Sequence, residues 1–153
     1  MNICLPRSAE ENNLMAQRIL KSIPGETVNN NERAALCALF LNDESEPVGA
    51  VMYYGLSEHN VFITIVIYDR RFATKEKFHE TFSLAFEDPL NVYRITALVA
   101  EENKASQRLC ERIGFHKEGT SIGLRGTEED VTHIYRYTQR DWYGSKFYGS
   151  DES

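Results

Sequence analysis

Two short segments of the chain hold polar residues whose types could support chemistry. In the first, the carboxylates of Glu101 and Glu102 are followed by the hydroxyl of Ser106 and the thiol of Cys110. A carboxylate can accept a proton or hold a cationic group, and a hydroxyl or thiol can donate a proton to a leaving group. Each also has an ordinary explanation, because loop carboxylates are usually solvated and a cysteine on a helix flank is more often a small core residue.

The second segment, residues 69–75, is basic and lies directly before a predicted helix. Arg70, Arg71 and Lys75 bring positive charge to a place where the first N–H groups of the helix also favour an anion. The same sequence would suit a solvated turn in which Thr74 caps the helix. The segment therefore predicts either an anion site or a capped basic turn.

The elements that would position these segments follow from the spacing of apolar residues. The first helix has Ser8 and Glu11 as a capping box and is expected to end at Pro24 and Gly25. Propensity alone would allow a helix over residues 34–41, but their length and hairpin partner favour a strand. The predicted order is helix, hairpin, strand, helix, strand, helix and hairpin, over residues 8–23, 34–41 with 47–56, 61–68, 74–87, 92–100, 103–113, and 115–124 with 131–138.

The apolar patterns also predict which residues face the core. The strand over residues 61–68 is β-branched and almost continuously apolar, so it is expected to be central and covered on both faces. In the helix that follows Asn103, its N-cap, we expect Ala105, Leu109 and Ile113 to face inward. A strand, a helix and a strand in succession predict a right-handed crossover between two parallel strands in a mostly antiparallel sheet.

Length and composition limit the class of protein. The 153 residues, 42% of them hydrophobic, suit one domain over residues 1–142 with a polar tail over 143–153 that is expected to be frayed. Three isolated cysteines and four isolated histidines predict neither a disulfide framework nor a metal site. The net charge of −6 disfavours a nucleic-acid partner. No apolar run approaches the roughly 20 residues of a membrane helix, so a cytoplasmic location with no membrane partner is expected.

The second half of the chain carries an ordered set of residues that resembles a known family. An arginine near the start of a strand is followed by an Asn-x-x-Ser that opens a helix, a Gly-Phe pair, an acidic residue with a glycine, an aspartate turn, a tyrosine-rich strand and a tryptophan. This set resembles the C-terminal half of the GNAT N-acetyltransferases, most closely the branch that acetylates the N-termini of ribosomal proteins. The matching residues are Arg94, Asn103, Ser106, Gly114, Phe115, Glu118, Gly119, Asp130, Tyr135 and Trp142.

The resemblance implies an α/β (α+β) GNAT fold, with a central mixed, mostly antiparallel sheet, splayed parallel middle strands and flanking helices. It also implies acetyl-CoA as the cofactor, with its pantetheine arm between strands that splay after Ile67 and Val99. The pyrophosphate would lie at the basic turn. The cofactor-binding residues implied in this way are Ile65, Val66, Ile67, Arg70, Arg71, Phe72, Ala73, Thr74, Lys75, Asn103 and Ser106.

Two features depart from the pattern of the family. Its members usually have glycines in the phosphate-binding turn, which let the backbone approach the phosphates, whereas residues 69–75 contain none. Many members also have a glutamate base on the central strand, which is missing here, and a tyrosine acid two turns beyond the asparagine, where this chain has Cys110. The catalytic residues that the resemblance leaves are Cys110, Glu101 and Ser106.

The expected function is acetyl-CoA-dependent N-acetylation of a primary amine (a protein N-terminus, a lysine or a small amine) by direct transfer in a ternary complex. The alternative is a catalytically weak or inactive GNAT-fold protein that binds and modulates another protein. The glycine-free turn also resembles that of GNAT-like proteins from bacteriophages, for which the partner would be a host enzyme. Trp142, Tyr143, Phe147 and Tyr148 would then anchor an interface, unless the tail folds back on its own domain. The sequence leaves the acceptor and the oligomeric state open.

Overall fold

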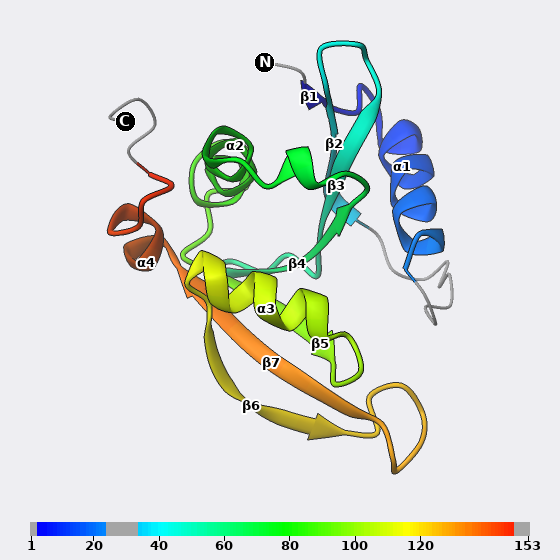
Figure 1. The fold of residues 1–153 in the computed structure, drawn as a ribbon, viewed down its shortest axis with the longest axis vertical. Coiled ribbons are helices and arrows are strands. Elements are labelled where there is room, and N and C mark those ends of the chain that lie inside the picture. Colours follow the sequence, from blue (N-terminus) through cyan, green and yellow to red (C-terminus); the bar gives the residue numbers. More distant parts are fainter. Residues whose placement is uncertain (1–2, 24–33, 149–153) are drawn as a thin grey trace.

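The computed structural model describes residues 3–23 and 34–148 of the chain. They form one seven-stranded sheet with helices on both of its faces (Figure 1). Along the chain the elements are β1 (Ile3–Cys4), α1 (Ala9–Lys21), β2 (Ala34–Leu41), β3 (Pro47–Tyr54), β4 (Asn60–Ile67), the 3-10 helix η1 (Arg70–Phe72), α2 (Lys75–Phe86), β5 (Arg94–Ala100), α3 (Lys104–Ile113), β6 (His116–Ile122), β7 (Val131–Thr138) and α4 (Gln139–Tyr143). The predicted order of elements is confirmed, and the short elements β1, η1 and α4 add to it.

The strands follow one another across the sheet in the order β1-β2-β3-β4-β5-β7-β6. Neighbouring strands are antiparallel except β4 and β5, which run parallel in the middle of the sheet. The connection between these two strands contains α2, so it is the crossover that the sequence predicts. The mixed, mostly antiparallel sheet with its parallel central pair confirms the predicted fold class.

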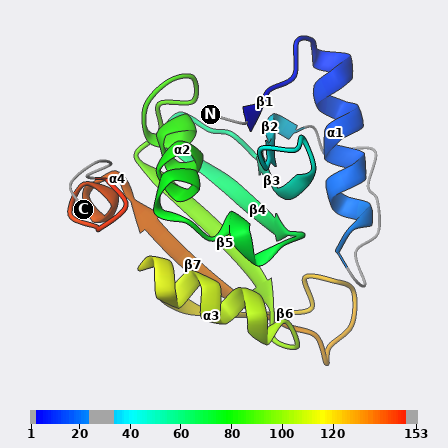
Figure 2. The same cartoon turned by 45° about the horizontal axis from the view of Figure 1, so that its top comes forward.

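The helices cover the sheet in two layers. Helix α1 packs against β2 and β3 on one face, where Ile19, Cys37 and Met52 are buried. Helices α2 and α3 lie on the opposite face (Figures 1 and 2). That face holds the larger core, in which the rings of Phe82 on α2 and Tyr137 on β7 pack with centroids 5.0 Å apart. Removing this aromatic surface from water is a large stabilising contribution to the fold.

Side-chain caps set the beginnings of three helices. Ser8, Thr74 and Asn103 each accept a hydrogen bond from the backbone N–H three residues further on. Gly114 follows α3 with a φ of 115°, a left-handed conformation that glycine adopts without steric cost. These boundaries confirm the prediction, whereas the predicted stop of the first helix beyond Lys21 lies outside the described residues. None of the described helices is long and apolar enough to cross a bilayer.

The inner face of helix α3 matches the prediction at Leu109 and Ile113 and differs from it at Ala105. Ala105, expected to face inward, is exposed, whereas Ser106, Leu109, Cys110 and Ile113 face the sheet. These four lie at i, i+3, i+4 and i+7, which is the spacing of one helical face. Counting only strongly apolar residues misplaces this face, because a serine and a cysteine belong to it. The difference has a functional consequence, since a hydroxyl and a thiol lie on the inner side of the helix.

The C-terminal segment packs against α2 instead of fraying. Trp142 is fully buried, Phe147 is 7% exposed, and the carbonyl oxygen of Phe147 lies 2.9 Å from Nδ1 of His79 on α2. The prediction of a frayed tail is therefore wrong up to residue 148, and residues 149–153 lie outside the described part of the chain. Two of the four aromatic residues considered as interface anchors belong to the core, as expected for a tail that folds back.

Candidate active site

The middle of the sheet opens where its two parallel strands part. Strands β4 and β5 are paired only as far as Ile63 and Ala97, although β4 continues to Ile67. The two strands were predicted to separate after Ile67 and Val99. This position is wrong, because they separate after Ile63 and Ala97. Among the described strands, none pairs with residues 64–67 on the β5 side. The peptide groups along that edge can accept a ligand in the way that an edge strand accepts a neighbour.

The open half of β4 is less buried than its sequence predicts. Val61 is fully buried and Ile63 is 4% exposed, whereas Ile65 and Val66 are half-buried and Ile67 is 38% exposed. The prediction that this apolar strand is covered on both faces is thus wrong for its second half. The cause is the departure of β5, which leaves apolar side chains beside an opening instead of inside a core.

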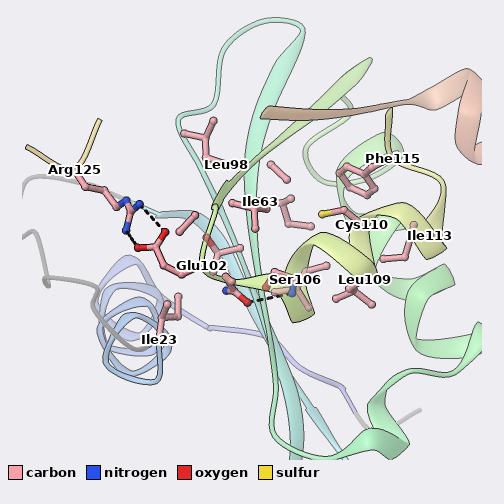
Figure 3. Close-up of a pocket in the computed structure, with 16 residues that line it drawn as sticks. Ile23, Ile63, Leu98, Glu102, Ser106, Leu109, Cys110, Ile113, Phe115 and Arg125 are labelled. Atoms are coloured by element: carbon pink, nitrogen blue, oxygen red, sulfur yellow. Dashed lines mark hydrogen bonds and ion pairs between the residues drawn. The ribbon is translucent and has the colours of Figure 1, made fainter. Parts of the chain in front are cut away.

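A cavity of about 410 Å³ occupies this opening (Figure 3). Its volume is in the range of sites for small organic ligands. Its walls come from β4, β5, α3 and nearby loops, and they consist of Ile23, Ile63, Thr64, Ile65, Ala97, Leu98, Val99, Ala100, Glu102, Asn103, Ser106, Leu109, Cys110, Ile113, Phe115 and Arg125. Figure 3 shows Cys110 and Phe115 at one end, and Glu102 and Arg125 at the other. The cavity is therefore apolar at one end and charged at the other.

The first turn of α3 forms one wall of the cavity. Asn103 caps the helix by accepting the N–H of Ser106 at 3.1 Å, and both residues line the cavity. The side-chain amide of Gln107 donates to the carbonyl oxygens of Ala100 and Glu101 at 3.1 and 2.8 Å, which ties the helix to the end of β5. The structure therefore brings two predicted cofactor-binding residues, Asn103 and Ser106, to the open part of β4.

An ion pair lies at the charged end of the cavity. The guanidinium of Arg125 donates to both carboxylate oxygens of Glu102, at 3.1 and 3.2 Å. These hydrogen bonds lower the pKa of Glu102 from its ordinary value. A carboxyl group in this setting keeps its negative charge at neutral pH, so it is better suited to hold a cation than to take up a proton.

Glu101, the predicted base, does not line the cavity. Its Oε1 lies 3.4 Å from Nε2 of His133 on β7. Both glutamates lie in the turn after β5, and of the two only Glu102 lines the cavity. The sequence offered both as candidates, and the structure brings Glu102 to the site.

Cys110 lines the apolar end of the cavity and is 8% exposed. Burial, with a smaller contribution from Glu111, raises the pKa of the Cys110 thiol to about 12. An ordinary thiol has a pKa near 8.5, so passing the Cys110 proton to an ordinary thiolate would cost roughly 5 kcal/mol. This environment favours a packing role for Cys110 over the predicted role as an acid.

The basic turn before α2 is folded around its own carboxylate. Asp69 accepts the backbone N–H of Arg71 at 2.9 Å and pairs with the Arg71 guanidinium at 2.7 Å. Phe72 is fully buried, and its ring packs directly over Gly49. A Cβ atom on Gly49 would lie only 2.5 Å from that ring. Of the predicted cofactor-binding residues, Phe72 therefore anchors the turn in the core, and its side chain does not face a ligand.

The sequence interpretation missed two residues that reach the cavity from other segments. Ile23 follows α1, and Arg125 comes from the turn between β6 and β7. Gly123 and Gly126 flank Arg125 with positive φ values, and such glycines signal a tight turn. No local pattern shows that the arginine in this turn points to a glutamate beyond β5, because that contact depends on how the hairpin lies across the sheet.

The family described as the acetyltransferase (GNAT) domain matches residues 4–116 of the chain. A chimera of spermidine N-acetyltransferase SpeG from Vibrio cholerae and hSSAT is 13% identical, with a TM-score of 0.68 over 93% of this chain and 99% of that chain. A GNAT-family acetyltransferase from Bacillus anthracis is 19% identical, with a TM-score of 0.63 over 92% and 96%. Ribosomal-protein-S5-alanine acetyltransferase from Vibrio fischeri is 19% identical, with a TM-score of 0.58 over 70% of this chain and 63% of that chain.

A comparison with curated proteins gives no match to this chain. At identities of 13% to 19%, the solved structures support the fold alone. The family match is stronger, because it spans α1 to α3 and so includes both strands that open at the cavity. The chain therefore belongs to the GNAT acetyltransferase family.

Proposed function

We propose that this protein transfers the acetyl group of acetyl-CoA directly to a primary amine bound at the same time. The observation that carries the proposal is the cavity of about 410 Å³ where β4 and β5 separate. One end of it is apolar and the other holds the ion pair of Glu102 and Arg125, so it suits a thioester arm and a polar amine side by side. Holding the two reactants together removes much of the entropic barrier to their reaction.

The donor arm fits the open edge of β4. Residues 64–67 lack a strand partner on the β5 side, so the amides of a pantetheine arm can pair with Ile65, Val66 and Ile67 as an added strand would. The side chains of Ile63 and Leu98 offer an apolar wall to the methylene groups of the arm. Bound acetyl-CoA would supply the thioester carbonyl: a neutral amine would form the new carbon–nitrogen bond as the carbon–sulfur bond breaks, the amine would lose a proton to solvent, and the departing thiolate would take one up.

The start of α3 is the part of the chain best placed to act on the thioester. Its N-terminal end carries partial positive charge, which favours negative charge developing on a carbonyl oxygen nearby. The hydroxyl of Ser106 lies in the same wall and can donate a hydrogen bond to that oxygen or to the departing sulfur. In this proposal Asn103 orients the first turn, and Cys110 closes the apolar end.

The Glu102 carboxylate is the proposed contact for the amine. Its pKa is lowered by the hydrogen bonds from Arg125, so the carboxylate stays ionised at neutral pH and can accept a hydrogen bond from a neutral amine beside the Arg125 guanidinium. Two of the similar structures are named for amine acceptors, spermidine and the alanine of ribosomal protein S5. Both observations favour a primary amine as the acceptor of this chain.

The alternative of a purely protein-binding function has less support. It is motivated by the glycine-free turn and by the missing glutamate and tyrosine, and it would use four aromatic residues near the C-terminus as surface anchors, of which Tyr143 and Tyr148 are exposed. Trp142 and Phe147 are buried in the core of this chain and cannot contact a partner without unfolding the segment.

Thermal unfolding with and without acetyl-CoA tests the proposal first. Ligand at about 100 times its Kd stabilises by about 2.7 kcal/mol, which raises the midpoint by about 5–10 °C for a chain of this length. The second step measures thiol release with a polyamine, a peptide with a free N-terminal alanine and an N-blocked lysine peptide. No midpoint shift at millimolar acetyl-CoA would refute donor binding, and a shift without thiol release from any amine would refute the acceptor class.

A further inference from the structure

The backbone amides of the turn before α2 are already bonded within the turn. The N–H groups of Arg71, Phe72, Ala73 and Thr74 donate to the Asp69 side chain, the Asp69 carbonyl, the Arg70 carbonyl and the Phe72 carbonyl, at 2.9, 2.9, 3.0 and 2.7 Å respectively. A phosphate held by backbone amides needs these groups to be free and to converge on it. The turn of this chain therefore offers a phosphate few of the donors that such a site requires.

The first of these amides, that of Arg71, already holds an anion, which is the carboxylate of Asp69. The hydrogen bond from the Arg71 guanidinium, with that from its backbone N–H, lowers the pKa of Asp69 to about 2. The group is therefore negatively charged throughout the physiological range and repels a second anion. Arg71, the central cation of the turn, is held by the same contact.

A second cavity, of about 400 Å³, lies beside this turn and is lined by three cations from three parts of the chain. Lys75 is at the start of α2, Arg112 is in the last turn of α3, and Lys146 is in the C-terminal segment. Phe78 and Phe147 form an aromatic wall, with ring centroids 5.2 Å apart. No carboxylate lines this cavity among the described residues. In a chain with a net charge of −6, such a cationic cavity indicates an anionic ligand.

The two cavities lie next to each other. Ile113, at the end of α3, lines both of them. A ligand of sufficient length can therefore place its reactive end beside β4 and its anionic end between α2, α3 and the C-terminal segment. Within the described residues, neither Arg112 nor Lys146 forms an ion pair with a carboxylate.

We infer that the phosphate groups of the acyl donor bind in this second cavity, to the side chains of Lys75, Arg112 and Lys146, instead of to the amides of the turn over residues 69–74. The identity of the ligand as the acyl donor rests on the proposed function, whereas its phosphate chemistry rests on the cavity itself. Side-chain cations make glycines in the turn unnecessary, because the phosphates need not approach its backbone. The packed C-terminal segment then has a function, since it brings Lys146 to the cavity.

The test uses the full chain with Arg112→Ala and Lys146→Ala combined, and three probes. Adenosine 3′,5′-bisphosphate carries phosphates on the nucleoside without the thioester arm, S-acetylpantetheine carries the thioester arm without phosphates, and acetyl-CoA carries both. We expect the double variant to bind the bisphosphate and acetyl-CoA about tenfold more weakly than the parent, because it lacks two charge contacts that solvent partly screens. Its affinity for S-acetylpantetheine should be unchanged. Bisphosphate binding by the parent should weaken as ionic strength rises, and acetyl-CoA should compete with it.

Arg108→Ala on α3 and Arg140→Ala on α4 are matched controls, since both side chains are exposed and line neither cavity. They should bind all three probes as the parent does, and an unchanged melting temperature checks the fold of every variant. Bisphosphate binding that the double variant retains, or an equal loss for S-acetylpantetheine, would overturn the inference. If acetyl-CoA fails to compete with the bisphosphate, the cavity holds a free nucleotide and the donor assignment is wrong. If the two compete but no amine is acetylated, the cavity assignment is supported and the proposed function alone fails.

Discussion

The two halves of strand β4 have similar sequences and different surroundings. Residues 60–63 pair with β3 on one side and β5 on the other, and Val61 within them is fully buried. Residues 64–67 keep the β3 partner but lose β5, and Ile67 is 38% exposed. The difference shows that one apolar strand stabilises the sheet in its first half and lines a cavity in its second. What decides between the two roles is the path of the neighbouring strand.

The largest expected effect is a difference in the free energy of unfolding between substitutions beside the two halves of β4. Ile95 on β5 is fully buried beside the paired half, so Ile95→Ala should lower the free energy of unfolding by about 2–5 kcal/mol through lost contacts and a residual cavity. Leu98 on the same strand lines the open half and is 38% exposed, so Leu98→Ala should cost about 1 kcal/mol or less. Urea denaturation measures both. Equal losses would show that the open half is as tightly packed as the closed one.

The second prediction fills the open half. Ser106→Phe places a large ring in the cavity wall and should reduce kcat/KM for acetyl-CoA at least about thirtyfold, or about 2 kcal/mol, because the ring occupies the space of the donor. Ala105→Phe, on the exposed side of the same turn, is the matched control and should stay within about twofold of the parent. A Ser106→Phe variant with parental activity would place the donor elsewhere.

The parts of this architecture that the sequence could predict are those set by local rules. The caps at Ser8, Thr74 and Asn103 and the glycine after α3 follow from interactions within a few residues, so the helix boundaries were predictable. The β-branched run of β4 likewise identified the central strand.

The parts that the sequence could not predict depend on distant elements. Strand twist sets the point at which β5 leaves β4. The position of the hairpin between β6 and β7 sets which glutamate after β5 reaches the cavity and pairs with Arg125. The C-terminal segment was misjudged because its glycines and polar residues mask Phe147, whose burial depends on α2.

The third prediction concerns the apolar end of the cavity. Cys110→Ala should leave kcat within about threefold of the parent and lower the free energy of unfolding by about 1 kcal/mol, because the thiol packs rather than donates a proton. A role as general acid predicts instead a loss of about 10²–10⁴ in kcat. Steady-state kinetics with urea denaturation distinguish the two, and Cys110→Ser, which keeps a donor, should restore activity only if the acid role is real.

The smallest expected effect is a dependence of stability on pH. Burial raises the pKa of Cys37, in the core under α1, and of Cys110 to about 12, so the folded state prefers both thiols protonated. A group whose pKa is raised on folding contributes stability that is complete below its unfolded pKa, near 8.5, and is lost as the pH rises toward its folded value. Between pH 8 and 10 the parent should therefore lose on the order of 1 kcal/mol more than Cys110→Ala, as measured by urea denaturation at each pH. Equal losses in the two proteins would show that water reaches the Cys110 thiol freely. The wall that α3 contributes to the cavity would then be as open to solvent as the second half of β4.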